Sequence, residues 1–229
     1  MKKKRIIEFI PAMVMALASV VILLVYLLVL RERSALMISV IFVALAISLV
    51  VPLLNTLFKL NIPLSFNIMV AVFTFAAIDL ASVMNFYDLV PYFDKAVHTS
   101  FGVVGGYGTF IFLLYGDGRK MKPWCFFIVL CLCVMGLAGL WEIFEYTASA
   151  IIGNDMQRWK PDLEAVGNMT VKEFFSTYNP LWDTMWDMIV AGFGVLAFCG
   201  AILIDRFCSY KMCRRIYGKL HPDGTDENK

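Results

Sequence analysis

Two carboxylates, Glu142 and Glu145, interrupt the apolar run that extends from Trp124 to Ile152. A charged carboxylate costs roughly 2.5 to 3.5 kcal/mol at the middle of a bilayer, so two of them on one helical turn need an explanation. Because residues three apart on a helix share a face, both side chains point toward the same neighbour. They are therefore expected to belong to a polar site buried among helices.

Two further pairs have the same character. Asp94 and His98 are four residues apart, as are Asp183 and Asp187, so each pair also shares one helix face. These faces continue inward through small residues, which let transmembrane helices approach closely. The small residues are Gly102, Gly105, Gly106, Gly136, Gly139, Ala191 and Gly194. The acid-bearing faces are thus expected to be the packed faces, pointing at one another and away from lipid.

The acidic residues predict a site that binds cations or protons. Asp79 also lies within an apolar segment, and with the five carboxylates of the three pairs it makes six, against Lys95 and at most a protonated His98. Carboxylates that are crowded in a low dielectric either take up protons or bind cations. The alternative is that the acids only hydrogen-bond between helices or reach the interface, which suits Asp94 and Asp183 singly.

The predicted metal ligands are the carboxylates and the imidazole of the three pairs: Asp94, His98, Glu142, Glu145, Asp183 and Asp187. Oxygen-rich ligation with one imidazole suits Mg²⁺, Mn²⁺ or Ca²⁺ and tolerates a carboxylate-bridged pair of iron ions, whereas zinc draws more nitrogen or sulfur. His98, Glu142 and Glu145 are the predicted catalytic residues. His98 is then either a metal ligand or a general base held by Asp94.

The elements that must position these residues are membrane-spanning helices. The chain has 229 residues, of which 60% are hydrophobic and only 17% charged, far from the soluble average. A helix needs about 20 apolar residues to cross the hydrocarbon. Six segments reach or approach this length: 7–30, 34–58, 64–86, 93–115, 124–152 and 184–205. The sequence predicts an all-α, polytopic bundle of six transmembrane helices, a single membrane domain over 1–229 in contact with the lipid bilayer and not with nucleic acid.

Lysine and arginine positions orient this bundle. Most of the 20 lysines and arginines fall on one side of the membrane if the N-terminus is cytoplasmic. Both termini are then cytoplasmic, with 206–229 as a cytoplasmic tail and 153–183 as an outer loop. At 1.5 Å per residue, the intramembrane acids all lie in the outer half of the bilayer, in one layer to which four helices contribute.

The outer loop and the cysteines are the remaining polar features. Thr170 and Glu173 fit a capping box that opens a short interfacial helix in the loop. Arg158 and Lys160 of the same loop are candidates to meet an anionic lipid head group.

All six cysteines fall in the predicted cytoplasmic half or in the tail under it, where none is placed for an external disulfide. Cys208 and Cys213 have a spacing that could begin a metal site. Two thiols without clear partners are weak evidence for one, which favours structural thiols.

The motifs around the acidic residues resemble those of a known family. Asp94-Lys95 with His98, Glu142-Ile143-Phe144-Glu145-Tyr146, and Asp183-Thr184-Met185-Trp186-Asp187-Met188 followed by Gly192 and Gly194 are similar to the motifs of the YjdF-like bacterial inner-membrane proteins. Their order also resembles, more distantly, that of VanZ-like membrane proteins linked to glycopeptide resistance. The resemblance covers roughly 64–205. It implies a multi-pass protein of the bacterial plasma membrane with a shared site, and it supplies no reaction.

Two functions remain open from the sequence, beside a third possibility, a binding or regulatory membrane protein whose acids only hold the bundle together. The first is an enzyme in which a metal-activated water in the outer leaflet attacks a lipid-linked or envelope substrate. The second is a proton- or cation-coupled transporter, or a cation-binding membrane protein, whose acids exchange protons or metal ions. Transport needs access from both sides, and the predicted cytoplasmic half of the helices carries almost no charge, which favours the enzyme. The sequence does not set the oligomeric state.

Overall fold

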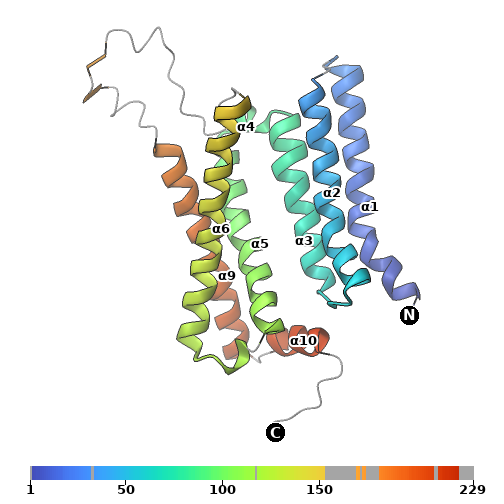
Figure 1. Ribbon diagram of the computed structural model, residues 1–229, viewed down its shortest axis with the longest axis vertical. Coiled ribbons are helices and arrows are strands. Elements are labelled where there is room, and N and C mark those ends of the chain that lie inside the picture. The colour runs from blue at the N-terminus through green and yellow to red at the C-terminus, as the bar shows by residue number, and fades with distance from the viewer. Residues whose placement is uncertain are drawn as a thin grey trace.

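Six long helices lie side by side in the structure, which is a computed structural model (Figure 1). It describes residues 2–31, 34–116, 118–152, 169, 170, 172, 173, 181–208 and 211–221. Within these residues all regular structure is helical. The helices long and apolar enough to cross a membrane are Ile6–Val29, Ala35–Leu57, Leu64–Val83, Phe93–Tyr115, Pro123–Ile151 and Trp182–Cys208. The predicted six-helix transmembrane bundle is therefore confirmed.

The first three spans pack together and form what we call the N-terminal half, on the right in Figure 1. Its helices are α1 (Lys2–Leu24) with the π-helix η1 (Val25–Val29), α2 (Ala35–Leu57), and α3 (Leu64–Thr74) with the π-helix η2 (Phe75–Val83). Met15, Ala44 and Ala71 form one small apolar core between them.

The last three spans form the C-terminal half: α5 (Phe93–Tyr115), α6 (Pro123–Ile152) and α9 (Trp182–Cys208). Its most extensive contacts join α5 to α9. Where these helices cross, Gly102 lies against the backbone of Ala191 and Gly194 against the backbone of Thr99, so closely that a Cβ on either glycine would overlap a carbonyl oxygen. Only glycine permits this approach. The prediction that the acid-bearing faces of these two helices are packed faces is confirmed.

One face of α6 is buried against the other helices of its half. The buried residues recur at helical spacing along that face: Leu130, Val134, Ala138, Glu142, Glu145 and Ala148. Large apolar side chains between them, such as Ile143 and Phe144, are exposed, as expected for a helix that faces lipid. Glu142 and Glu145 therefore point into the bundle.

The two halves contact each other mainly through α3 and α5, and the short α4 (Phe86–Leu89) connects them. The ring centroids of Phe66 and Tyr107 lie 5.4 Å apart, and the hydroxyls of Ser65 and Tyr107 share a hydrogen bond of 2.7 Å. This interface is less extensive than the one between α5 and α9.

The predicted cytoplasmic tail contains a helix that the sequence did not reveal. α10 (Lys211–Leu220) lies across the lower end of the bundle in Figure 1. Asp205 caps it by accepting hydrogen bonds of 3.0 and 3.2 Å from the backbone N–H groups of Met212 and Cys213. Its apolar face, which includes Ile216, is buried in an apolar core to which both halves contribute.

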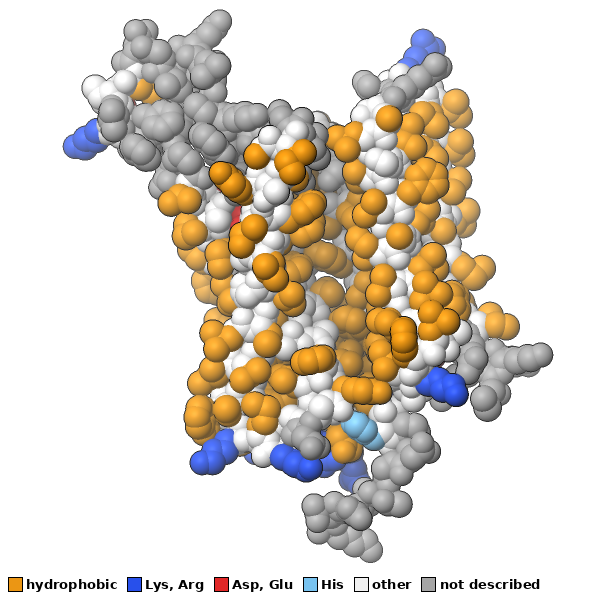
Figure 2. All heavy atoms as spheres, viewed as in Figure 1, with side chains coloured by type: hydrophobic (Ala, Val, Ile, Leu, Met, Phe, Trp, Pro, Cys, Tyr) orange, Lys and Arg blue, Asp and Glu red, His pale blue; other side chains and the backbone are white. Residues whose placement is uncertain are grey.

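Lysine and arginine side chains gather at this lower end (Figure 2). Arg119, in the short turn η3 (Gly118–Lys120), stacks on the ring of Tyr217 in α10 at 4.0 Å. The start of α1 and the end of α10 also lie at this end of the bundle (Figure 1). The first helix therefore begins, and the last helix ends, at the same end of the bundle as these basic side chains.

The loop between α6 and α9 contains the predicted capping box. The backbone N–H of Thr170 donates to Glu173 Oε2 at 2.8 Å, and the backbone N–H of Glu173 donates to Thr170 Oγ1 at 3.3 Å. The Thr170 hydroxyl also donates to Glu173 Oε2 at 2.8 Å. The bonds that the Glu173 carboxylate accepts, first from the backbone N–H of Thr170 and second from its hydroxyl, lower the pKa of Glu173 below its ordinary value. The rest of the predicted interfacial helix lies outside the described residues, as do Arg158 and Lys160.

Candidate metal centre

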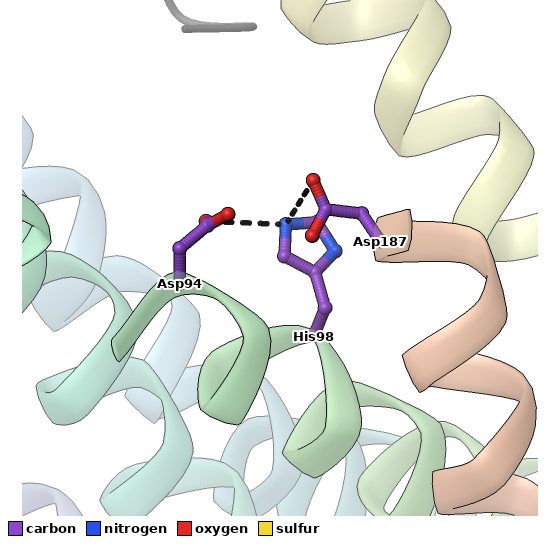
Figure 3. A group of neighbouring side chains, drawn as sticks. All are labelled: Asp94, His98 and Asp187. Carbon is purple, nitrogen blue, oxygen red and sulfur yellow. Dashed lines mark ion pairs between the residues drawn. The ribbon is translucent and has the colours of Figure 1, made fainter. Parts of the chain in front are cut away.

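Three potential metal ligands meet where α5 and α9 run together at the end of the bundle opposite α10 (Figure 3). His98 Nε2 lies 3.6 Å from Asp94 Oδ1 and 3.8 Å from Asp187 Oδ2. One donor atom from each of these three residues lies within 4.8 Å of the other two. His98 and Asp187 are buried, with exposed fractions of 6% and 1%. We call Asp94, His98 and Asp187 the carboxylate–histidine cluster.

The local sequence explains why these residues meet. Asp94 and His98 occupy successive turns on one face of α5, and Gly102 continues this face by one more turn. At Gly102 the helix touches Ala191, which lies one turn after Asp187 on α9. The glycine contact therefore sets the distance between the helices, and the polar side chains occupy the turns directly above it.

Lys95 lies beside the cluster and forms ion pairs with three aspartates, two of which belong to the cluster. Its Nζ lies 2.9 Å from Asp94 Oδ2 and 2.7 Å from Asp187 Oδ1, and it also forms an ion pair with Asp183. Lys95 is not among the predicted site residues, although it follows Asp94 directly and its long side chain can reach the neighbouring helix. Asp183, a predicted metal ligand, pairs with Lys95 in this structure, and a ligand role for it stays a prediction.

Glu142 and Glu145 reach the site from α6. Glu142 Oε1 lies 4.0 Å from His98 Nδ1, whereas the two aspartates lie at Nε2. Glu145 accepts a hydrogen bond of 2.8 Å from the indole N–H of Trp141, one turn before it. Both glutamates are buried. The position of Glu142 suits a partner of the imidazole better than a metal ligand beside the aspartates. A ligand role for either glutamate stays a prediction.

Asp79 lies in the N-terminal half, away from the cluster. Its side chain is fully buried in η2, close to the equally buried Ser19 of α1. Among the described residues, the Ser19 side chain is the polar neighbour of the Asp79 carboxylate, but neither carboxylate oxygen of Asp79 nor the Ser19 hydroxyl makes a hydrogen bond of ordinary geometry. The expectation that Asp79 belongs to the same site as the other acids is therefore wrong, because position along a helix fixes the depth of a side chain but not the neighbour that it faces.

None of the six cysteines, all of which the structure describes, forms a disulfide. Cys208 is exposed, whereas Cys213 is buried. Burial raises the pKa of the Cys213 thiol to about 12, which keeps it protonated and makes it a poor metal ligand. This favours the structural interpretation of the pair.

The fold and the site define a polytopic α-helical membrane protein with a buried carboxylate–histidine cluster. A family model described as "Predicted membrane protein (DUF2238)" matches residues 11–207, and the chain belongs to this family. No curated protein and no solved structure matches the chain. The match extends from α1 to α9, so the family includes both halves of the bundle. The YjdF-like and VanZ-like resemblances stay predictions.

Proposed function

We propose that the protein is an enzyme that depends on a divalent cation, and that the carboxylate–histidine cluster binds this cation. The observation that carries the proposal is the placement of Asp94, His98 and Asp187. Their donor atoms lie 3.6 and 3.8 Å apart. Ligands at roughly 2.0 to 2.6 Å from a metal ion lie roughly 3 to 5 Å from one another, so one ion between these atoms needs little rearrangement.

Charge supports the same proposal. The site contains five carboxylates and one lysine: Asp94, Glu142, Glu145, Asp183, Asp187 and Lys95. In a site largely closed to water, an excess of negative charge is relieved by a bound cation or by protons. The oxygen donors with one imidazole suit Mg²⁺, Mn²⁺, Ca²⁺ or iron better than zinc.

The surrounding residues have distinct roles in this proposal. Glu142, on the Nδ1 side of His98, would fix the tautomer that turns Nε2 toward the ion. Glu142 and Glu145 are also placed to take a proton from an attacking water. Lys95 would hold Asp183 and Asp187 together before an ion binds. The ion itself would activate the water and polarise the substrate.

The distribution of basic residues supports an outward-facing site. Because Lys and Arg side chains gather at the α10 end, we infer that this end is cytoplasmic, and the cluster then lies in the outer half of the bilayer. A site at this depth is within reach of lipid-linked or envelope substrates at the outer surface of a bacterial plasma membrane. An anionic head group on such a substrate would complement the bound cation.

Cation-coupled transport is the weaker candidate. Directly below the cluster, α5 and α9 meet through Gly102, Ala191 and Gly194, with no space between their backbones for a path among the described residues. Val195 and Phe198 continue this contact as part of the apolar core. A path between α5 and α9 is therefore blocked below the site, which suits an enzyme better than a transporter.

Lipid turnover tests the proposal. The purified protein is reconstituted in vesicles of total bacterial membrane lipids, and products are followed by mass spectrometry with Mg²⁺, Mn²⁺, Ca²⁺ or Fe²⁺ and with a chelator. We expect products that need one of these cations and that the Asp187→Asn variant does not form. Product levels identical in wild type, Asp187→Asn and chelator-treated samples would overturn the enzyme proposal.

A further inference from the structure

A large apolar cavity lies between the two halves of the bundle. Its volume is about 900 Å³, and its walls come from α2, α3, η2, α5 and α6. The surface between the halves is hollowed there, and hydrophobic side chains border the hollow on both sides (Figure 2). Leu137 and Leu140 line the cavity and are also exposed on the lipid-facing side of α6. A molecule in the bilayer therefore has lateral access to it.

The cavity follows one face of α5 and ends at the carboxylate–histidine cluster. His98 lines one end and Phe112 the other, with Phe101 and Gly105 between them. Fourteen residues of helix span roughly 21 Å, more than half of the roughly 30 Å hydrocarbon core of a bilayer. Trp141, which donates to Glu145, lines the cavity at the same end as His98. The space is thus long and mostly apolar, with His98 and Trp141 at one end.

The length and the lining identify the kind of molecule that fits. The space is roughly 21 Å long and has a volume of about 900 Å³, and most of the side chains along it are apolar. Its opening beside Leu137 and Leu140 faces the bilayer, which supplies hydrocarbon chains. A hydrocarbon chain would restore the packing contacts that an empty space between the helices lacks.

We propose that this cavity binds the hydrocarbon chain of a membrane lipid, with an anionic head group of that lipid at the carboxylate–histidine cluster. The inference rests on the proposed function, for which it names the substrate class. The lipid enters sideways from the bilayer, and its hydrocarbon chain runs along α5 from His98 toward Phe112. The cavity selects for a long chain, and the cluster acts on the head group.

Gly136 offers a way to fill the cavity without disturbing the helices. It lines the space, and in the described part of the chain a Cβ at this position would meet no atom within 4 Å. The prediction that Gly136 lies on a packed face is therefore wrong. Gly200 of α9 has the same free space at its Cβ but does not line the cavity. Gly136→Leu and Gly200→Leu are matched substitutions, one inside the cavity and one outside.

The experiment uses two photoreactive forms of phosphatidylglycerol in phosphatidylethanolamine vesicles, with a diazirine near the carbonyl carbon of the acyl chain or near its methyl end. After irradiation, labelled peptides are mapped by mass spectrometry. We expect the first probe to label residues near His98 and Trp141, and the second to label residues near Thr109 and Phe112. Gly136→Leu should reduce this labelling by about tenfold, since overfilling a packed space is unfavourable. Gly200→Leu should not.

Three results would overturn the inference: labelling spread evenly over the lipid-facing surface, labelling at the same residues by both probes, or equal labelling in the two leucine variants. If Gly136→Leu does not fold, as judged by its melting temperature, the positions labelled by the two probes in the wild type decide by themselves. Metal content is measured on the same samples. If the two probes label opposite ends of the cavity and no metal is bound, the proposed metal-dependent enzyme is refuted and the lipid site is kept. If metal is bound and the probes label no defined positions, the lipid site is refuted and the metal site is kept.

Discussion

The two halves of the bundle both bury acidic side chains within the membrane, but they surround them differently. In the N-terminal half, Asp79 is fully buried and has only the Ser19 hydroxyl beside it. In the C-terminal half, Asp94, Asp183 and Asp187 share the ammonium group of Lys95. A single acid can be replaced by an apolar side chain at little cost, whereas removing one member of a charged network leaves the others unpaired. The chemistry is therefore expected in the C-terminal half.

The halves also differ in how their helices meet. Gly102 and Gly194 bring the backbones of α5 and α9 into direct contact beneath the cluster. Between the halves, by contrast, the helices leave an apolar cavity of about 900 Å³. The tight contact fixes the distances among the proposed ligands, and the loose contact leaves space for the proposed lipid.

The largest effect is expected from Gly102→Leu. Because a Cβ at Gly102 would overlap the carbonyl oxygen of Ala191, the added side chain must force α5 and α9 apart. We expect a loss of about 3 kcal/mol or more in the free energy of unfolding, measured by thermal denaturation in detergent. Gly200→Leu, at an open position of α9, is the control and should change the melting temperature little. Equal losses in both variants would contradict the importance of this contact.

Lys95→Met should be the next most disruptive change. It removes the one ammonium group that three aspartates share, and the side chain of Lys95 is only 24% exposed. We expect a loss of about 2 kcal/mol in metal-free protein, less than for a fully buried pair because water screens part of the charge. Added Mn²⁺ should raise the melting temperature of this variant more than that of wild type. An unchanged melting temperature without metal would show that the aspartates do not depend on Lys95.

Glu142→Gln should weaken cation binding without abolishing it. Glu142 lies at Nδ1 of His98, so the substitution removes the charge behind the imidazole and leaves Asp94 and Asp187 in place. We expect cation affinity to fall by about 10- to 100-fold, the usual effect of losing a partner behind a ligand. Isothermal titration calorimetry with Mn²⁺ measures this. A complete loss of Mn²⁺ binding would instead show that Glu142 is itself a metal ligand.

Asp79→Leu should have the smallest effect, and in the opposite direction. Because the Asp79 carboxylate makes no hydrogen bond of ordinary geometry among the described residues, an apolar side chain should be neutral or stabilise the protein by up to about 1 kcal/mol. Thermal denaturation measures the change, and Mn²⁺ affinity should equal that of wild type. A marked loss of stability or of affinity would place Asp79 in the functional network.

Much of the fold follows from the sequence because a bilayer demands long apolar segments. The six spans were predictable for this reason, and the acid pairs were predictable because helical spacing fixes which side chains share a face. α10 was missed because its ten residues mix charged and apolar side chains and are too short for a span. Its amphipathic spacing was the available signal.

The parts of the site that the sequence did not reveal depend on how helices are arranged around one another. Asp79 has the depth of the other acids, but η2 turns it toward α1. Gly102 and Gly136 look alike in the sequence, yet one permits backbone contact and the other lines a cavity. Hydropathy gives neither the rotation of a helix nor the space between two halves of a bundle.

Metal analysis of three purified proteins tests the central claim most directly. Wild type, Asp187→Asn and Asp79→Asn are dialysed against Mn²⁺, and the bound metal is measured by mass spectrometry. We predict about one ion per chain in wild type and in Asp79→Asn, and a large loss of bound metal in Asp187→Asn. The reason is that Asp187 contributes a donor atom to the cluster and Asp79 does not. The dialysis is repeated with Mg²⁺, Ca²⁺, Fe²⁺ and Zn²⁺. Wild-type protein that binds none of these five ions, or equal binding in all three proteins, would contradict the claim.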